Sequence, residues 1–437
     1  MYAFLPTLRF TKKGRPNTGY EVQFLGVLAS KRSTLQVRQR HWAITLALIY
    51  AFQLGAGFAY SYFPRYLATL GLGAAAIGML LSVTSVARSV SMPVWSWFAD
   101  FPDSEGEHRG RRFVQVLFVL ASPFLLLPFI QNPWIVGSLL VWSSLTLGST
   151  LPILDVVTMR ELGAGAFGRI RAWGSLGFGL TAGSFALAGL WLTHEALALL
   201  SPWVIVVGTL AAGFAAFSMP ASSPVQEYTS KASWKDFLVM LRNPWILVLM
   251  PLWSLHWASQ MPYNVFIVFF AEEQGFASWA PGAAVALGIA AEIAFLARGQ
   301  TLIDRLGPTL SFGVMVIFTA LRWILSAFAL NSFVFVALQV LHGLSFGGFM
   351  LSMMAVLNKE VDPKIRTSAQ SLLYVIVFGV GGAIGQALSG WILDESDGKT
   401  LFLAAGGLEL LVCVPTLIII VGYRMRGRHR RVQKETY

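Results

Sequence analysis

Long apolar runs separated by short polar segments organise the chain. A helix needs about 20 apolar residues to cross the hydrocarbon core of a bilayer, and twelve such runs occur. The first six are Trp42–Tyr62, Ala74–Ala99, Phe113–Ile130, Trp134–Val157, Ile170–Leu192 and Ala196–Met219. The second six are Trp245–Phe270, Ala280–Leu296, Thr309–Leu330, Phe333–Leu357, Ser368–Leu393 and Leu401–Tyr423. The pattern predicts an all-α membrane protein with twelve transmembrane helices.

The longest polar connection, residues 220–244, divides these runs into two groups of six. We therefore expect an N-terminal arm at residues 1–41, a six-helix bundle at 42–219, a connector at 220–244, a second bundle at 245–423 and a basic tail at 424–437. Motifs recur weakly between the groups, since an Asp and nearby Arg residues follow both the second and the eighth run. Two pseudo-symmetric six-helix bundles are expected.

Composition and charge placement support this interpretation. Only 12% of the residues are charged and 56% are hydrophobic, whereas soluble domains carry about 25% charged residues. If the N-terminus is inside, 28 of the 32 Lys and Arg residues fall in cytoplasmic segments, and only Arg65 and Lys399 fall outside. Such a bias fixes orientation. We expect a multi-pass protein of the inner (cytoplasmic) membrane with both termini cytoplasmic, and the net charge of +11 needs no nucleic-acid partner.

Enzyme chemistry finds no support in the motifs. Cys413 is the single cysteine, so neither disulfides nor a thiolate metal site is expected. No HExxH pattern, the signature of zinc hydrolases, occurs. The one GxSxG match, Gly343-Leu-Ser-Phe-Gly347, lies inside an apolar run and not at the strand-to-helix turn that the serine hydrolase signature requires. We predict no enzymatic activity, no cofactor and no metal. We also expect the protein to work as a monomer in the lipid bilayer.

Ionisable residues inside the apolar runs are candidates for function, because a charge at the bilayer centre costs roughly 3 kcal/mol. They are Arg88, Asp155, Glu292, Arg322, His342 and Glu409. A carboxylate such as Glu292 is favoured there when protonated, which suits a proton carrier, and His342 is able to share that proton. The alternatives stay open: Arg322 neutralises a carboxylate, His342 joins two helices, and Glu409 is protonated or lies at a helix contact.

Polar and small residues also recur at helical spacing. His256, Gln260 and Asn264 form one stripe on the seventh run, and we expect it to line water and to contribute to the substrate site. Small residues four apart, Gly179 and Gly183 in the fifth run and Gly381, Gly385 and Ser389 in the eleventh, let helix backbones approach closely. They predict either static packing or a surface that slides.

Charged residues at the cytoplasmic ends of two runs suggest a gate. Asp100 and Arg109 follow the second run, and Asp304 and Arg305 follow the eighth. We expect them to form salt bridges that close the inner side. A solvated pair without such a role is the alternative.

Several short motifs resemble one family. They are Tyr62-Phe63-Pro64, Phe167-Gly-Arg-Ile-Arg171-Ala-Trp-Gly174, Leu321-Arg-Trp323, Leu341-His-Gly-Leu-Ser-Phe-Gly347 and Ala369-Gln-Ser371. Over residues 40–423 the chain resembles the lactose-permease-like and phenylpropionate-permease-like branch of the major facilitator superfamily. The resemblance implies a secondary transporter that works by alternating access, with its site between the two bundles near the midplane.

The resemblance also implies roles for particular residues. Arg171 falls where the lactose permease has its sugar-binding arginine, Phe178 matches the aromatic residue that stacks on the sugar, and Asp155 matches the acidic partner. Glu292, Arg322 and His342 match the acid, arginine and histidine of the proton-coupling half. This sequence departs at Ser345, His256 and Gln260, where the permease has acids. Lactose itself is therefore not the expected substrate.

The expected function is proton-coupled uptake of a small organic solute. Arg88, Arg171 and Arg322 favour a carboxylate, and the abundance of aromatic residues suits a ring. An aromatic or other organic acid is the first substrate class, and a sugar or nucleoside the second. Drug or metabolite efflux is one alternative. A transport-inactive membrane sensor is another, suggested by the long basic tail after Tyr423.

Overall fold

A computed structural model describes residues 18–99, 110–221, 243–361 and 366–435. All regular secondary structure in these residues is helical. The elements of the first half are α1 (Thr18–Ala59), α2 (Phe63–Thr69), α3 (Ala74–Ala99), α4 (Gly110–Leu120), η1 (Ser122–Phe129), α5 (Pro133–Thr146), η2 (Leu147–Ser149), α6 (Thr150–Leu162), α7 (Ala164–Ala188) and α8 (His194–Phe217).

The second half is built in the same way and contains more irregular turns. Its elements are α10 (Pro244–Ser259), α11 (Met261–Glu273), α12 (Ala280–Arg298), α13 (Gln300–Leu306), α14 (Pro308–Ala327), α15 (Ser332–Leu338), η3 (Gln339–Leu341), η4 (Gly343–Gly348), α16 (Phe349–Glu360), α17 (Arg366–Tyr374), η5 (Val375–Gly381), α18 (Gly382–Glu395) and α19 (Gly398–Glu435). The segments η4 and η5 are π-helical turns inside the tenth and eleventh passages.

Ten helical passages in the described residues are long and apolar enough to cross a membrane. The other two expected passages are α7, which is rich in glycine and carries Arg169 and Arg171, and α10 with α11, which is interrupted at Gln260. Pro262 in the first turn of α11 accounts for the interruption, because proline cannot donate the backbone hydrogen bond that would continue α10. The predicted all-α membrane fold is confirmed.

The ends of the chain differ from the predicted division. Residues 18–41 of the expected arm are continuous with the first passage, since α1 runs without interruption from Thr18 to Ala59, and residues 1–17 lie outside the described residues. The expected tail likewise continues α19 as far as Glu435. Most of the connector, residues 222–242, lies outside the described residues.

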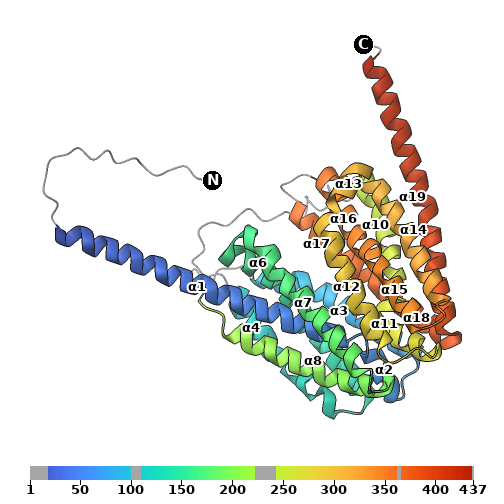
Figure 1. Ribbon diagram of the computed structural model, residues 1–437, viewed down its shortest axis with the longest axis horizontal. Coiled ribbons are helices and arrows are strands. Elements are labelled where there is room, and N and C mark those ends of the chain that lie inside the picture. The colour runs from blue at the N-terminus through green and yellow to red at the C-terminus, as the bar shows by residue number, and fades with distance from the viewer. Residues whose placement is uncertain (1–17, 100–109, 222–242, 362–365, 436–437) are drawn as a thin grey trace.

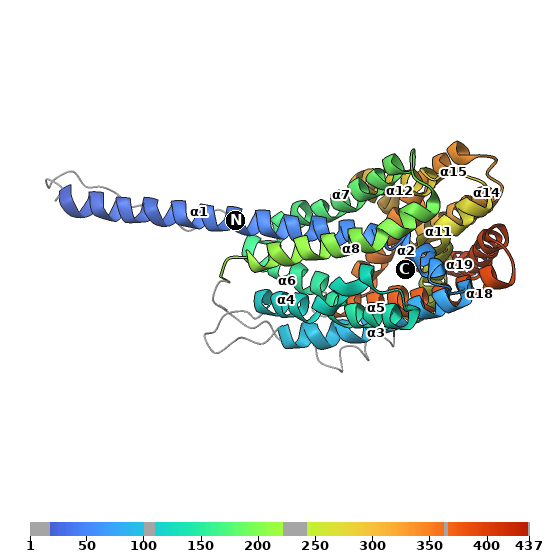
Figure 2. The same cartoon turned by 90° about the horizontal axis from the view of Figure 1, so that it is seen from below.

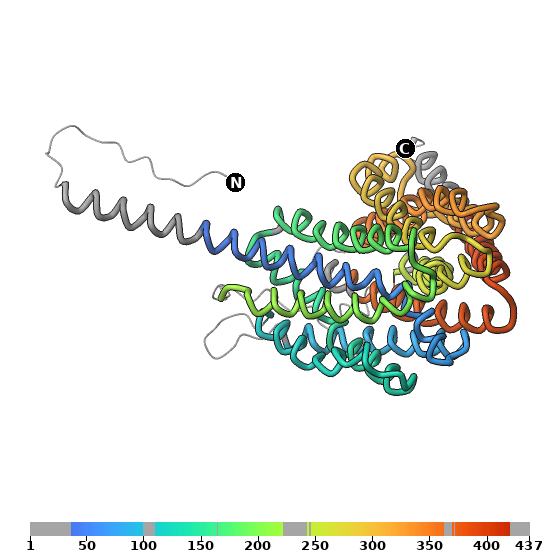
Figure 3. The backbone as a smooth tube through the Cα atoms, turned by 60° about the horizontal axis from the view of Figure 1, so that its bottom comes forward, coloured from blue at the N-terminus to red at the C-terminus, as the bar shows by residue number. Residues whose placement is uncertain are grey.

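The two halves form two bundles that meet at one end and diverge at the other. In Figure 1, α1 extends to the left and the end of α19 extends upward, while α2, α11 and the turn between α18 and α19 gather at the lower right. The tube view separates the blue-to-green half from the yellow-to-red half (Figure 3). We call the end near α2 and α11 the converging end.

Backbone contacts join the halves mainly through two helix pairs, α3 with α18 and α7 with α12 (Figure 2), and less through α3 with η5 and α2 with α11. Glycines make these contacts possible. A Cβ on Gly78 would lie 2.5 Å from the carbonyl oxygen of Gln386, and one on Gly282 would lie 2.6 Å from the backbone nitrogen of Ala186. These close approaches resist any side chain larger than hydrogen.

The predicted small-residue ladders pack differently from these contacts. A Cβ on Gly381 or Gly385 would meet the backbone of α10 at Ser254 or Ala258, inside the second half. A Cβ on Gly183 would meet nothing within 4 Å. The close contacts of α7 with α1 are instead made by Gly174 and Gly177. Of the predicted ladder on α7, Gly179 alone faces the other half, since its Cβ would lie 3.8 Å from Ile289 of α12. Spacing therefore identified the surface between the halves only in part.

Candidate functional site

The first half holds an ion pair with a tyrosine. The Nε atom of Arg171, in α7, lies 3.4 Å from Oδ1 of Asp155, in α6. The hydroxyl of Tyr50, in α1, donates to the same oxygen at 2.5 Å, and the guanidinium lies over the tyrosine ring, 5.3 Å from its centroid. Three helices thus place one carboxylate between a cation and a hydroxyl donor.

This cluster faces the second half. The side chains of Arg171 and Asp155 are 38% and 30% exposed, although both belong to membrane passages. Tyr374, at the end of α17, interacts electrostatically with both, and Gln370 donates to its hydroxyl at 3.2 Å. Polar groups of the second half therefore lie near the ion pair.

The other first-half candidates lie apart from the ion pair. Phe178 packs edge-to-face on Phe58 with ring centroids 5.6 Å apart, inside a cluster of aromatic residues. Arg88, in α3, lies against Gly148 of η2 and interacts electrostatically with Tyr60. Its charge therefore does not add directly to that of Arg171.

Arg322, in α14, is the centre of the polar network in the second half, and its side chain is fully buried. Its Nε donates to Gln339 at 2.9 Å, and its Nη1 donates to Ser345 Oγ at 2.9 Å. The guanidinium also lies over the rings of Tyr263 and Trp323, at 4.4 and 4.2 Å. Among the described residues no carboxylate contacts Arg322, which differs from the expected direct neutralisation.

His342 connects Arg322 to Glu292. Arg322 Nη1 lies 3.0 Å from Nδ1 of His342, and His342 Nε2 lies 3.4 Å from Oε2 of Glu292, in α12. A guanidinium only donates, so Nδ1 must accept and the ring hydrogen must be on Nε2, directed at the carboxylate. The three residues predicted to form the coupling centre are thus connected by direct contacts, with His342 between Arg322 and Glu292.

The polar stripe that was expected to line water on the seventh passage is buried over its first two residues. His256 and Gln260 have their hydrogen-bond partners inside the second half. His256 is bonded to Glu409 of α19, and Gln260 Oε1 accepts from Arg322 Nη1 at 3.4 Å. Asn264, beyond the interruption, is partly exposed.

The contact between His256 and Glu409 was missed, although each residue was noted as a polar group in an apolar run. The two lie 153 positions apart. A histidine and an acid in different apolar runs were the available signal, since each needs a buried partner. Nothing in the pattern says which partner each one finds.

The predicted inner gate is not formed in the described residues. Asp304 and Arg305 are exposed in α13, at the diverging end (Figure 1). Asp304 accepts from Gln300 of the same helix at 2.8 Å. Asp100 and Arg109 lie outside the described residues.

The converging end holds contacts that the sequence pattern did not suggest. Arg65 of α2 pairs with Glu272 of α11 at 2.7 Å, and its hydrogen bonds hold the pKa of the Glu272 carboxyl below the usual range. His194 Nε2, at the start of α8, lies 3.0 Å from the carbonyl oxygen of Phe276. Both contacts join the two halves.

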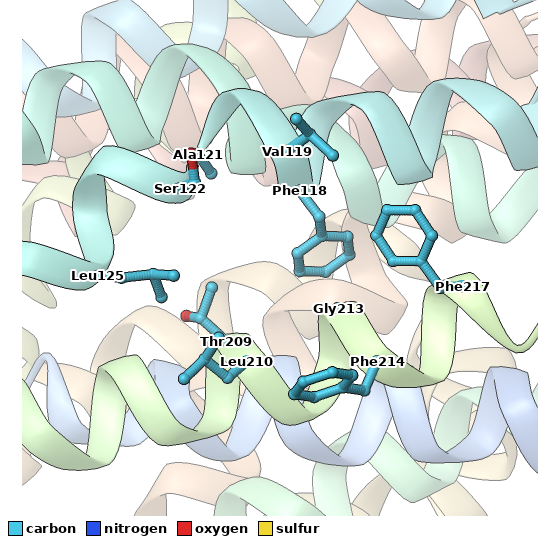
Figure 4. A pocket seen from close by; sticks show the side chains of 10 residues that line it. All are labelled: Phe118, Val119, Ala121, Ser122, Leu125, Thr209, Leu210, Gly213, Phe214 and Phe217. Atoms are coloured by element: carbon cyan, nitrogen blue, oxygen red, sulfur yellow. The ribbon is translucent and has the colours of Figure 1, made fainter.

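An apolar crevice of about 140 Å³ lies between α4 with η1 and α8 (Figure 4). Its lining contains no charged residue, and the hydroxyl of Thr209 bonds to Ile205 within α8. Phe214 and Phe217 at its rim are exposed. The crevice lies within the first half, and besides Thr209 the only polar residue of its lining is Ser122. In the described part of the chain no group of three or more His, Cys, Asp or Glu side chains is arranged to hold a metal ion.

Comparisons with known proteins place the chain among transporters. It matches the MFS_1 like family over residues 42–404. The uncharacterized transporter YwbF of Bacillus subtilis (strain 168) is 24% identical over 385 residues, which cover 86% of this chain and 92% of that protein. The xanthosine permease of Escherichia coli (strain K12) is 27% identical over 276 residues, 57% of this chain and 64% of that protein.

Solved structures share the fold. The crystal structure of the nucleoside transporter NupG has a TM-score of 0.74 at 18% identity, over 87% of this chain and 99% of that chain. A bacterial homologue of the human lysosomal transporter Spinster, in an inward-facing conformation, has a TM-score of 0.65 at 14% identity over 88% and 95%. The chain belongs to the MFS_1 like family and is a multi-pass membrane transporter with the major facilitator fold.

Proposed function

We propose that the protein imports a small organic solute together with protons, by alternating access, as a monomer in the cytoplasmic membrane. The Lys and Arg bias supports an orientation with both termini and the connector inside. The diverging end, which carries α13, would then face the cytoplasm, and the converging end with Arg65 and Glu272 would face outward. Bundles at residues 42–219 and 245–423 would rock about the solute.

The ion pair of Arg171 with Asp155 carries this proposal. Its partial exposure and the nearby Tyr374 and Gln370 suit a solute bound between the halves. Phe178 lies about two turns further along α7, where its ring packs on Phe58 and is partly exposed. We propose that Arg171 and Asp155 make the polar contacts to the solute, with Tyr50 holding the carboxylate in place.

We propose a neutral heterocyclic or sugar-like solute, such as a nucleoside, ahead of an aromatic acid. Asp155 balances the charge of Arg171, and Arg322 is buried away from any solute. The excess of positive charge at the site, which favoured a solute with a carboxylate, is therefore reduced. A carboxylate paired with a guanidinium offers both an acceptor and donors, which suits hydroxyl groups and ring nitrogens. The relatives named xanthosine permease and nucleoside transporter support the same order.

We propose that Glu292 carries the coupling proton. Its side chain is 13% exposed, and its partner His342 is 11% exposed, so both are more accessible than Arg322. A change in the protonation of Glu292 would act on Arg322 through His342, which contacts both residues. Gain or loss of one proton would then change the charge balance at the centre of the second bundle.

Transport by purified protein in proteoliposomes tests these proposals. The solutes are uridine, xanthosine, maltose and phenylpropionate, each radiolabelled and assayed with and without an inward proton gradient. Accumulation of a nucleoside that depends on the gradient is the expected result. Accumulation of phenylpropionate alone would restore the aromatic-acid alternative.

Two further outcomes separate the alternatives for direction and activity. Uptake only into inside-out vesicles with an opposed gradient would indicate efflux. Binding of a solute, measured by thermal stabilisation, without flux in any direction would indicate a transport-inactive sensor.

A further inference from the structure

A histidine and a glutamate inside the second bundle have no part in the proposed transport cycle. His256 lies in the last turn of α10 and Glu409 lies in α19, and both side chains are fully buried. Nδ1 of His256 lies 2.9 Å from Oε1 of Glu409 and 3.0 Å from Oε2. Nε2 lies 2.9 Å from the backbone carbonyl oxygen of Ser345. Both ring nitrogens therefore face oxygen atoms of other helices.

These contacts determine how many protons the pair holds. A carbonyl oxygen only accepts, so Nε2 of His256 must carry a hydrogen. A bare Nδ1 and an ionised carboxylate would both be acceptors, so one further proton must lie between them. If it is on Nδ1, the pair is an imidazolium and a carboxylate. If it is on Glu409, the pair is a neutral imidazole and a carboxylic acid, and the net charge is zero in both cases.

The surroundings of the pair disfavour loss of that proton. The ring of His256 packs against Phe312 and Phe349, with centroids 5.8 and 4.5 Å away. The hydroxyl of Ser259 is hydrogen-bonded to the carboxyl of Glu409. Without the proton, a single negative charge would remain among aromatic rings with no cation in direct contact with it in the described residues, and a buried charge without a direct partner is strongly unfavourable.

Two other ionisable groups face the pair. Arg322 reaches it through Ser345, whose hydroxyl accepts from Nη1 at 2.9 Å and whose carbonyl accepts from His256. Cys413, one turn beyond Glu409 on α19, interacts with it electrostatically. A guanidinium does not release its proton. Arg322 therefore couples the His256–Glu409 pair to the His342–Glu292 pair electrostatically. It does not pass a proton from one pair to the other.

We propose that His256 and Glu409 form a buried proton-binding site, distinct from Glu292, that holds one proton in this conformation. The site joins α10 to α19 directly before the interruption at Gln260. The proton is therefore part of what holds the end of α10 in place. This goes beyond the proposed function, because the site is occupied whether or not Glu292 couples transport.

Nuclear magnetic resonance and infrared spectroscopy of the protein in lipid bilayers test the site. Histidine is labelled with nitrogen-15 and glutamate with carbon-13, and spectra are recorded at about pH 7. The His256 signals are assigned by their loss in His256→Gln. The expected result is either an imidazolium at His256 or a protonated carboxyl band that disappears in Glu409→Gln. A neutral His256 with a bare Nδ1, together with no acid band from Glu409, would overturn the proposal.

Variants separate this site from Glu292. In Glu409→Gln the amide nitrogen donates to Nδ1, so the variant should fold and His256 should become the neutral ring with its hydrogen on Nε2. In Glu292→Gln the His256 signals should stay as in the wild type, and their loss would show that the sites are not distinct. If Glu409→Gln does not insert, His256→Gln still decides the matter. The glutamine amide is also able to donate to the carboxylate, so the carboxyl band of Glu409 is identified there by its shift. A band that is ionised in both proteins, together with a bare Nδ1 on His256 in the wild type, would contradict the site.

Discussion

The guanidinium of Arg65 makes two hydrogen bonds to the carboxylate of Glu272, from Nε at 2.7 Å and from Nη2 at 3.1 Å. The two residues come from different halves and lie at the converging end (Figure 1). Parallel hydrogen bonds of this kind fix the geometry of both side chains. The pair therefore closes one end of the molecule, while Asp304 at the opposite end is not paired across the halves within the described residues.

Neutralising this contact should open the converging end. In Glu272→Gln the charge is lost, and an ion pair this exposed contributes about 1 kcal/mol or less, so the open population should rise by up to about fivefold. Distances between spin labels at Leu192→Cys and Glu395→Cys, in a Cys413→Ser background, measure that population. An unchanged distance distribution would show that the contact does not hold this end closed.

The same contact predicts a pH dependence. Arg65 lowers the pKa of Glu272 in this state, so its stabilising effect is fully present above the ordinary glutamate value of about 4.3. It is lost as the pH falls through the lowered value. The label distances should therefore stay constant across the neutral range and lengthen only in acid. Lengthening in the neutral range would show that a group other than Glu272 controls this end.

A methyl group at Gly282 should force the converging end apart. A Cβ there would lie 2.6 Å from the backbone nitrogen of Ala186 and 2.8 Å from the carbonyl oxygen of Ala182, and backbone atoms of α7 cannot move independently of the helix. Gly282→Ala should lengthen the label distances and slow transport. Gly183→Ala is the matched control, because its Cβ meets nothing within 4 Å, and it should behave as the wild type.

Arg171→Lys should weaken solute binding about tenfold, or about 1.4 kcal/mol. Lysine keeps the charge but loses the planar donor fork and the stacking on Tyr50. Arg169→Lys is the control, since Arg169 is exposed at the same end of α7. Dissociation constants from thermal stabilisation of the purified variants measure the effect. Equal constants for wild type and Arg171→Lys would remove Arg171 from the site.

Glu292→Gln should abolish accumulation against a gradient and leave exchange intact. The amide oxygen still accepts from His342 Nε2, and Arg322 keeps Gln339, Ser345 and His342 as partners, so the variant should insert normally. Uphill uptake should fall at least about tenfold, because the amide does not titrate. Normal uphill uptake by an inserted variant would move the coupling role to another carboxylate, with Asp155 the first candidate.

A reporter that is active only in the periplasm, fused after Tyr437, should be silent. The reason is the retention of Lys and Arg on the cytoplasmic side. The same reporter fused after Lys399 in a truncated chain should be active and serves as the positive control. Activity of the fusion after Tyr437 would invert the whole topology, including the assignment of Arg65 and Glu272 to the outer side.

Part of the candidate site was predictable because its residues lie at known positions of the family motifs. Arg171 and Asp155 were expected to pair through the resemblance, and they lie 3.4 Å apart. Glu292 and His342 were expected as partners, and they are in contact. Pro262 also indicated the helix interruption at Gln260, but a hydropathy pattern takes no account of the backbone effect of proline.

The sequence by itself determined the helical passages and their division into two groups of six, because hydropathy acts on each segment separately. It also predicted the orientation, since charge bias is counted loop by loop. Only the tertiary structure decided that Glu409 meets His256, that Arg322 contacts amides and hydroxyls, and that Arg65 and Glu272 close one end. Each of these depends on how helices distant in the chain pack and tilt, and the spacing of residues along one helix does not contain that information.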